Sequence, residues 1–316
     1  MAFETVLGQL PAIETLRRAL ATGRVHHAYR FEGPDGVGKE RVAFELAQEL
    51  VCDRNDAVGR RRVVTTNPGE PPVPQHPDVV LVQRGLYGKL ITASEATGIS
   101  VEQIRRIVLP RAGYPPHEGH GLVFIVRDAD ELTTSAANAL LKTLEEPGPR
   151  THFVLLTSRP HRLLDTVRSR THAVRFGPLS DEDVTRILGQ HGAPTHLVRL
   201  AAGSAGRALR LVDTDALEQH QRFVERAFAA MAAPDLTAAL ALSEERPTER
   251  SALAEQLGWL AQAFVDQVRG HLPADPRSAA QAARRHQLVT QAANELERNA
   301  QPALVVETLL IRLRAC

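Results

Sequence analysis

The chain has 316 residues, of which 43% are hydrophobic and 24% charged, as in ordinary globular proteins. This length favours two or more domains. The formal net charge of +1 excludes histone-like basicity, although not a local nucleic-acid-binding surface. The only cysteines, Cys52 and Cys316, exclude a disulfide scaffold and a four-cysteine zinc site. Because the chain has neither a signal-peptide start nor an apolar run of roughly 18–20 residues, we expect a soluble cytoplasmic protein with no membrane span.

Residues 1–175 alternate short apolar runs with helical patterns, which is typical of a parallel sheet with crossover helices. The patterns predict strands at 27–31, 79–82, 122–126, 153–156 and 173–176, and helices from Pro11, at 38–51, at 100–108 and at 134–146. Residues 53–75 are charged and then rich in Pro and Gly, so we expect an exposed excursion there. We interpret its triplet Arg60–Arg62 as part of a solvated loop rather than as a phosphate contact.

Strand patterns end at Pro178, and the rest of the chain has helical spacing. We therefore predict an α/β domain at 1–175, a small helical domain at 176–214 and an all-α C-terminal domain at 215–316. Within the last domain, a final helix opens at Pro302, and one buried stripe is formed by Leu253, Leu257, Leu260, Phe264 and Val268.

The strongest local motif is the glycine-rich stretch Gly33-Pro34-Asp35-Gly36-Val37-Gly38-Lys39, which lies between a predicted strand and a predicted helix. Gly33, Gly36 and Gly38 allow backbone N–H groups to surround phosphates, and Lys39 would reach the outer phosphates. Lysine is otherwise found only twice in this arginine-dominated chain. The motif therefore indicates a P-loop, and a plain glycine turn is the alternative.

Two positions on the Mg²⁺ side of this site depart from a working ATPase. The residue after the P-loop lysine is normally Ser or Thr, which binds Mg²⁺, but here it is Glu40. After the strand at 122–126, an active site would place Asp and then Glu, but Arg127 and Asp128 stand there. These departures predict a degenerate P-loop without ATP hydrolysis. We interpret Asp128, Asp130 and Glu131 as a solvated loop that caps the next helix.

Ser169 and Arg170 follow the strand predicted at 153–156 and form a third candidate site. An arginine that faces outward can be a simple surface charge. It can also act in trans as an arginine finger, which stabilises charge on a phosphoryl group bound by a neighbouring subunit. The residues alone leave both interpretations open.

The P-loop, the stretch Ala136-Ala137-Asn138-Ala139-Leu140-Leu141-Lys142-Thr143-Leu144-Glu145-Glu146-Pro147 and the pair Ser169-Arg170 resemble the clamp-loader subunits of bacterial DNA polymerase III. These subunits are AAA+ proteins, and the resemblance covers about residues 5–212. Glu40, Arg127 and His76-Pro77-Asp78 are similar to the delta-prime type. Gly206 also resembles that type, because it stands where an active ATPase has a sensor arginine.

The resemblance implies a subunit of a hetero-pentamer with gamma/tau and delta subunits, which loads the sliding clamp on primer–template DNA. It implies that Arg170, with Ser169, completes the ATP site of a neighbouring gamma/tau subunit. It also implies that residues 1–175 form a nucleotide-fold domain, residues 176–214 a lid and residues 215–316 a collar. ATP binding by this chain is not expected. Zinc is not expected either, since the family's four-cysteine module is reduced to Cys52. The alternatives are a gamma/tau-like subunit that hydrolyses ATP with Lys39, and a separate P-loop kinase.

Overall fold

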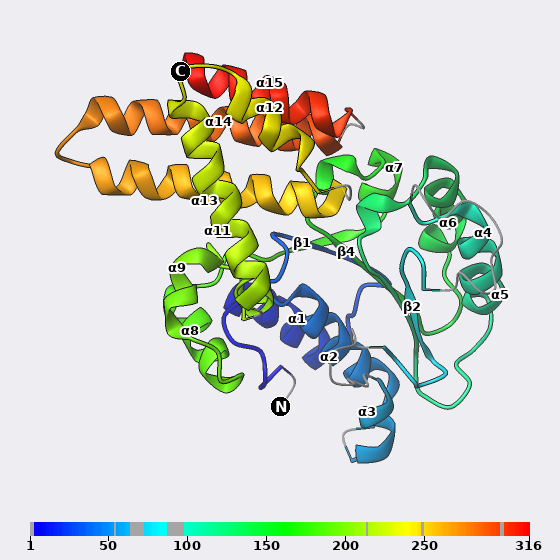
Figure 1. Cartoon of the computed structure of the whole chain (residues 1–316). Helices are drawn as coiled ribbons and strands as arrows, with labels where there is room; N and C mark the ends of the chain where they lie inside the picture. Colours follow the sequence, from blue (N-terminus) through cyan, green and yellow to red (C-terminus); the bar gives the residue numbers. More distant parts are fainter. Residues whose placement is uncertain are drawn as a thin grey trace. The chain divides into compact units, whose positions relative to one another are not determined.

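The structure is a computed structural model that describes residues 3–53, 55–63, 73–86, 98–212, 214–247, 250–297 and 300–316. The chain divides into two compact units, Met1–Leu209 and Arg210–Cys316, which are described separately (Figure 1). The predicted division of the first unit into a nucleotide-fold domain and a lid stays a prediction.

A five-stranded parallel sheet forms the centre of the first unit (Figure 1). The sheet order is β2-β3-β4-β1-β5, and the strands are β1 (Ala28–Glu32), β2 (Val79–Val82), β3 (Leu122–Val126), β4 (Thr151–Thr157) and β5 (His172–Arg175). All five predicted strands are confirmed. Strands β2 and β3 are buried along their whole length, as expected for apolar runs covered on both faces, whereas the edge strand β5 buries only Val174. The parallel arrangement gathers the carboxyl ends of the strands at one edge and their amino ends at the opposite edge.

Helices cover both faces of this sheet (Figure 1). The helices of the first unit are α1 (Leu10–Ala21), α2 (Lys39–Val51), α3 (Ala57–Val63), α4 (Val101–Gln103), α5 (Leu109–Ala112), α6 (Thr134–Glu145), α7 (Asp165–Arg168), α8 (Asp181–Gln190), α9 (Val198–Ala201) and α10 (Ala205–Arg210), the last of which crosses into the second unit. On one face, Phe124 of β3 and Phe153 of β4 stack with ring centroids 5.0 Å apart. The side chains of α6 pack into the same hydrophobic cluster.

The helix predicted at 100–108 begins where its capping pattern indicates. The Ser100 hydroxyl accepts a hydrogen bond from the Gln103 backbone N–H, and the Gln103 side chain accepts one from the Ser100 backbone N–H. The helix is longer than predicted, because α4 continues through a π-helical turn at Ile104–Val108 into α5 and ends at Ala112.

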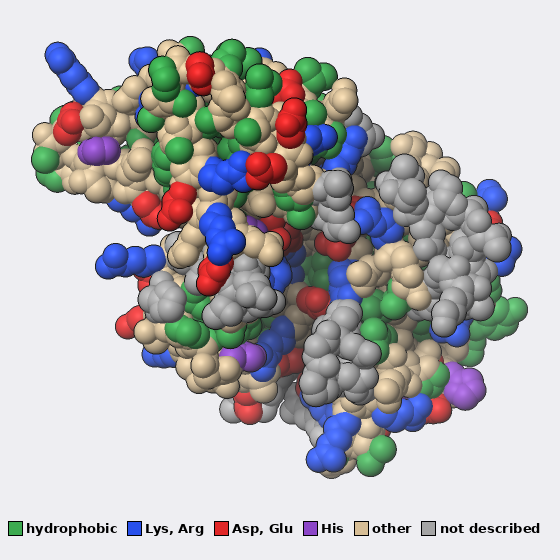
Figure 2. All heavy atoms as spheres, in the orientation of Figure 1, with side chains coloured by type: hydrophobic (Ala, Val, Ile, Leu, Met, Phe, Trp, Pro, Cys, Tyr) green, Lys and Arg blue, Asp and Glu red, His purple; other side chains and the backbone are tan. Residues whose placement is uncertain are grey.

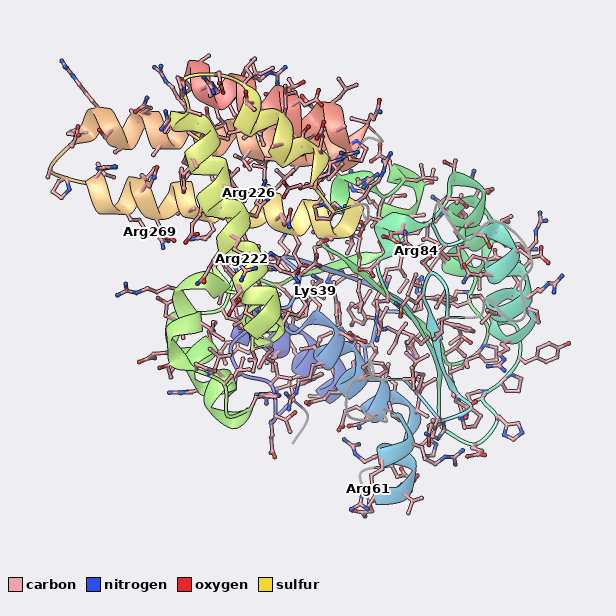
Figure 3. All side chains as sticks on the ribbon, in the orientation of Figure 1. Lys39, Arg61, Arg84, Arg222, Arg226 and Arg269 are labelled. Atoms are coloured by element: carbon pink, nitrogen blue, oxygen red, sulfur yellow. The ribbon has the colours of Figure 1, made fainter. Side chains whose placement is uncertain are left out.

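The prediction of an exposed loop over residues 53–75 is wrong at residues 57–63, which form helix α3. The Asp56 carboxylate accepts a hydrogen bond from the Gly59 N–H and thereby caps the first turn. Arg60 pairs with Glu49 at 2.7 Å, while Arg61 is exposed (labelled in Figure 3). Residues 64–72, which include the Pro/Gly-rich part of the predicted excursion, lie outside the described residues.

The second unit is helical, as predicted. Its helices are α11 (Thr214–Ala232), α12 (Thr237–Glu244), α13 (Arg250–His271), α14 (Pro276–Glu297) and α15 (Pro302–Ala315). Four members of the predicted stripe on α13 are fully buried, namely Leu253, Leu257, Leu260 and Phe264. None of the helices in the described part of the chain combines the length and the apolar character that a membrane crossing requires.

Candidate functional site

The P-loop joins β1 to α2 at the carboxyl edge of the sheet. Gly33, Gly36 and Gly38 have φ angles of 155°, 71° and 101°, and residues with a side chain rarely adopt such values. Gly38 is the N-cap of α2, so the loop leads directly into a helix amino terminus. This is the backbone geometry of a phosphate-binding loop.

The ammonium group of Lys39 is held by backbone carbonyl oxygens of the P-loop. Lys39 is only 7% exposed (labelled in Figure 3), and its Nζ donates hydrogen bonds to the carbonyl oxygens of Gly33 (2.5 Å) and Pro34 (2.7 Å). A carboxylate oxygen of Asp35 lies 3.5 Å from the same nitrogen. Burial lowers the pKa of Lys39, although the charge of Asp35 opposes the shift. A phosphate would have to displace these partners.

The two Mg²⁺-side departures, Glu40 and Arg127, form an ion pair with each other. Nη2 of Arg127 donates to Oε1 of Glu40, and Nη1 donates to the side-chain oxygen of Gln83. Only 11% of the Arg127 side chain and 33% of the Glu40 side chain are exposed. The guanidinium therefore supplies the positive charge beside Glu40, and this pair of residues does not fit a Mg²⁺ site.

Asp130 is buried, so the interpretation of residues 128–131 as a solvated loop is wrong at this position. Its carboxylate accepts hydrogen bonds from the Thr157 hydroxyl (2.6 Å) and from Nε of Arg159 (2.7 Å). Asp130 thus connects the turn after β3 to the end of β4, while Asp128 stays exposed. The next helix, α6, is capped by the Thr133 hydroxyl.

The residues after α9 contact the P-loop directly, a feature that the sequence analysis missed. The Ser204 hydroxyl donates to the Asp35 carbonyl (2.7 Å), and the Gly206 N–H donates to the Gly36 carbonyl (3.0 Å). A Cβ atom on Gly206 would lie 2.7 Å from the Cα of Gly36. The two glycines therefore allow a backbone-to-backbone contact that holds the start of α10 on the loop.

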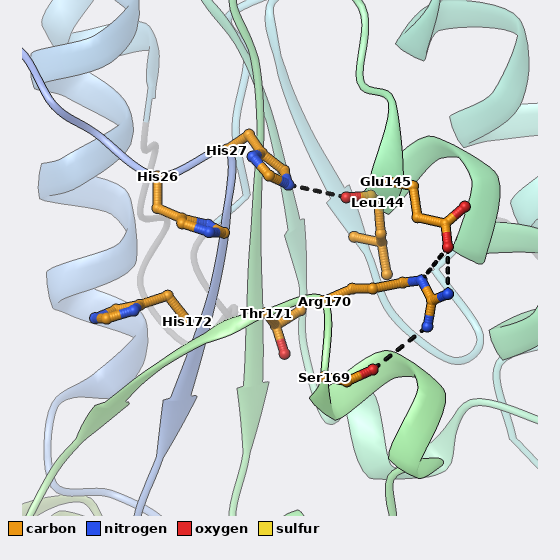
Figure 4. A pocket seen from close by; sticks show the side chains of 8 residues that line it. All are labelled: His26, His27, Leu144, Glu145, Ser169, Arg170, Thr171 and His172. Atoms are coloured by element: carbon orange, nitrogen blue, oxygen red, sulfur yellow. Dashed lines mark hydrogen bonds and ion pairs between the residues drawn. The ribbon is translucent and has the colours of Figure 1, made fainter.

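Arg170 lies at the opposite, amino edge of the sheet, between α7 and β5 (Figure 4). Its Nε donates to Oε1 of Glu145 at 2.5 Å, and its Nη2 pairs with the same oxygen. Its Nη1 donates to the Thr166 carbonyl (2.9 Å) and to the Ser169 hydroxyl (3.3 Å). The structure therefore brings the predicted residues Ser169 and Arg170 together and adds Glu145.

A pocket of about 410 Å³ opens beside Arg170 and was not predicted (Figure 4). Nε2 of His27 lies 2.9 Å from the carbonyl oxygen of Leu144. The His27 ring stacks on the His26 ring, with the two ring centroids 4.4 Å apart. Burial lowers the pKa of His26, and the charge of His27 acts in the same direction. Both histidines therefore make structural contacts at this edge of the sheet. The pocket is lined by His26, His27, Leu144, Glu145, Ser169, Arg170, Thr171 and His172.

The sheet separates this pocket from the chain's own P-loop. Arg170 precedes β5 and the P-loop follows β1, and the two strands are parallel neighbours. One five-residue strand spans roughly 15 Å at about 3.3 Å per residue. Arg170 consequently cannot reach a phosphate bound at its own P-loop, and any phosphate that it contacts must come from another molecule.

Known proteins resemble this chain over the unit that contains both sites. Residues 8–180, more than half of the chain, match the family described as DNA polymerase III, delta subunit. The chain belongs to this family. The α/β fold with a parallel sheet and the helical C-terminal part, both predicted from the sequence, are confirmed by the structure.

Curated relatives include both delta-prime and gamma/tau subunits of DNA polymerase III. The delta-prime subunit of Bacillus subtilis is 31% identical over 219 residues, which are 67% of this chain and 60% of that protein. The gamma/tau subunit of Mycobacterium tuberculosis is 32% identical over 223 residues, 67% of this chain and 36% of that protein. The chain thus matches less than two thirds of each relative's length.

Among solved structures, a DNA polymerase III gamma subunit-related protein from Thermotoga maritima is similar, with 17% identity and a TM-score of 0.48. The similarity covers 96% of this chain and 99% of that one.

Proposed function

We propose that this chain is the delta-prime-type subunit of a bacterial clamp loader and donates Arg170 to an ATP site on a neighbouring gamma/tau-type subunit. The observation that carries the proposal is the placement of Arg170 in an open pocket at the sheet edge opposite its own P-loop. An arginine with this placement can stabilise phosphoryl charge only in trans. Ser169 supports it by accepting a hydrogen bond from Nη1.

The closed state of the chain's own P-loop supports the delta-prime type over the gamma/tau type. The ammonium group of Lys39 donates its hydrogen bonds to carbonyl oxygens of the loop, and Arg127 neutralises Glu40. The backbone N–H of Gly206 holds the start of α10 on the loop. Family relatives of both types match this chain about equally well, so these three contacts carry the distinction. We infer that the P-loop persists as a structural support and that this chain neither binds ATP with Mg²⁺ nor hydrolyses it.

The second unit offers a surface for assembly with other subunits. Leu236 and Leu240 are 45% and 51% exposed at α12, and Leu304 and Ile311 are 55% and 52% exposed on α15. Figure 2 shows exposed hydrophobic side chains over α12 and α15. We propose that residues 215–316 form a collar that packs against gamma/tau and delta subunits in a hetero-pentamer. In this proposal the sliding clamp and primer–template DNA are engaged through the assembly.

The direct test replaces Arg170 with alanine in a loader reconstituted from purified subunits. The variant should assemble normally, while the ATPase rate stimulated by clamp and primed DNA falls about tenfold or more, since fingers of this kind contribute large rate factors. Arg168→Ala is the matched control, because Arg168 pairs with Asp165 on the exposed surface of helix α7, two residues before Arg170. Hydrolysis that is unchanged in Arg170→Ala would refute the arginine-finger role.

Nucleotide titration of the isolated chain distinguishes the two subunit types. We expect no ATP binding up to millimolar concentration, with or without Mg²⁺. Micromolar, Mg²⁺-dependent binding would instead support a gamma/tau-like ATPase. The variant Glu40→Thr combined with Arg127→Asp restores the residues of an active site, and a gain of binding by it would identify the P-loop as a decayed nucleotide site.

A further inference from the structure

The guanidinium of Arg170 is already engaged on every nitrogen within its own chain. Its Nη1 contacts two neutral acceptors, the Thr166 carbonyl in helix α7 and the hydroxyl of Ser169, the C-cap of that helix. Its Nε and Nη2 both contact one oxygen of Glu145, which lies on a different helix (Figure 4). The two edges of the guanidinium thus have different partners, one neutral and local, the other charged and distant in sequence.

Glu145 is the last residue of α6, a position where a carboxylate is unfavourable on its own. The carboxyl end of a helix carries a partial negative charge, which repels an acidic side chain in the last turn. Arg170 compensates this repulsion. The pair is also open to solvent, with 46% of the Glu145 side chain and 31% of the Arg170 side chain exposed, so a competing anion can reach it.

We propose that Glu145 is a latch that occupies the Nε and Nη2 edge of Arg170 until a phosphate of the neighbour's ATP displaces it. The inference rests on the proposed trans role of Arg170. A nucleotide phosphate takes the same guanidinium edge as a carboxylate, bidentately and with more charge, so the two anions compete for one site. The bonds from Nη1 to Thr166 and Ser169 do not compete and keep the side chain in place during the exchange.

Glu145 in this role is a positioning residue, and its effect should appear in KM rather than in kcat. A competitor that is displaced on binding weakens ground-state and transition-state contacts equally, which changes KM alone. Exposed ion pairs contribute little, so we expect Glu145→Gln to lower the KM for ATP of the reconstituted loader by about two- to fivefold at unchanged kcat. Glu145→Asp, which retains the charge, should lie between Glu145→Gln and the wild-type chain.

The matched control is Glu146→Gln, which removes the same charge one residue later. Glu146 is exposed, so this variant should keep the wild-type KM. If Glu145→Gln leaves KM unchanged while Arg170→Ala still abolishes stimulation, the latch is refuted and the finger stands. If Arg170→Ala has no effect, the proposed function itself fails.

A second measurement on the isolated full-length chain tests the latch without any ATPase. Phenylglyoxal modifies accessible guanidinium groups, and mass spectrometry can follow its reaction at Arg170. The modification rate should rise about two- to fivefold in Glu145→Gln and stay at the wild-type value in Glu146→Gln. Equal rates in all three chains would show that Glu145 does not hold Arg170 and would overturn the proposal.

Discussion

The ion pair between Glu40 and Arg127 is expected to stabilise the first unit, and a double-mutant cycle measures how much. The variants are Glu40→Gln, Arg127→Gln and the double substitution, which remove either charge or both. Exposed pairs contribute about 0.2–1 kcal/mol, whereas breaking a fully buried pair costs about 3–5 kcal/mol. With 11% of Arg127 and 33% of Glu40 exposed, each single substitution should cost about 1–2 kcal/mol.

The coupling between the two sites is the decisive quantity. Because each single variant leaves one charge without its partner, the double variant should be more stable than the sum of the singles predicts, by about 1 kcal/mol. Salt should reduce this coupling only in part, since the pair is half-buried.

The assay has to report on the first unit. The only tryptophan, Trp259, lies in the second unit, so its fluorescence does not follow this region directly. Hydrogen exchange of the amides of β3 across a urea series reports unfolding beside Arg127. Additivity within about 0.3 kcal/mol would show that the two charges do not interact. Arg127 would then not be the group that neutralises Glu40.

Three further outcomes follow from contacts elsewhere in the chain. Burial opposes ionisation of Asp78, but three backbone N–H donors outweigh it and lower its pKa. Asp78→Asn should therefore cost about 2 kcal/mol at pH 7. The difference should shrink as the pH falls below about 4, because the carboxylate of the unfolded chain protonates before that of the native chain, and an equal loss at pH 3 in acid unfolding would contradict this. Gly206→Ala should lower the stability of the first unit by about 1–3 kcal/mol and speed amide exchange in α10, because the new Cβ would meet the P-loop. Gly189→Ala, with open space around its Cβ, should change neither quantity, and equal exchange in both variants would refute the backbone contact. Phe264→Ala should destabilise the second unit by about 3–5 kcal/mol in urea unfolding followed by Trp259, and a loss below 1 kcal/mol would contradict its place in the core.

Much of the fold could be predicted because its signals are local. Strands β2, β3 and β4 contain continuous apolar runs, and a run of this kind is stable only when both faces of the sheet are covered. The helix start at Ser100 was recognisable from a hydroxyl that caps the backbone three residues later. Helix α3 was missed because Pro and Gly further along the segment outweighed the capping residue Asp56.

The candidate site was predicted only in part, since its key contacts join distant segments. Glu40 and Arg127 were each recognised as departures from an active site, but nothing in the sequence indicated that they pair across 87 positions. Arg170 was singled out, yet its partner Glu145 comes from another helix. The buried role of Asp130 depends on the end of β4, which only the strand order brings beside it.

The sequence by itself predicted most of the helices and strands, the glycine-rich loop and the unusual residues Glu40 and Arg127, because these follow from short-range spacing and residue chemistry. Only the tertiary structure decided what Glu40 and Arg127 contact and which edge of the sheet carries Arg170. Strand order and parallel direction place the P-loop at one edge of the sheet and Arg170 at the other. The same packing sets Arg127 against Glu40 and Glu145 against Arg170, since charges far apart in the chain meet only when the sheet has formed.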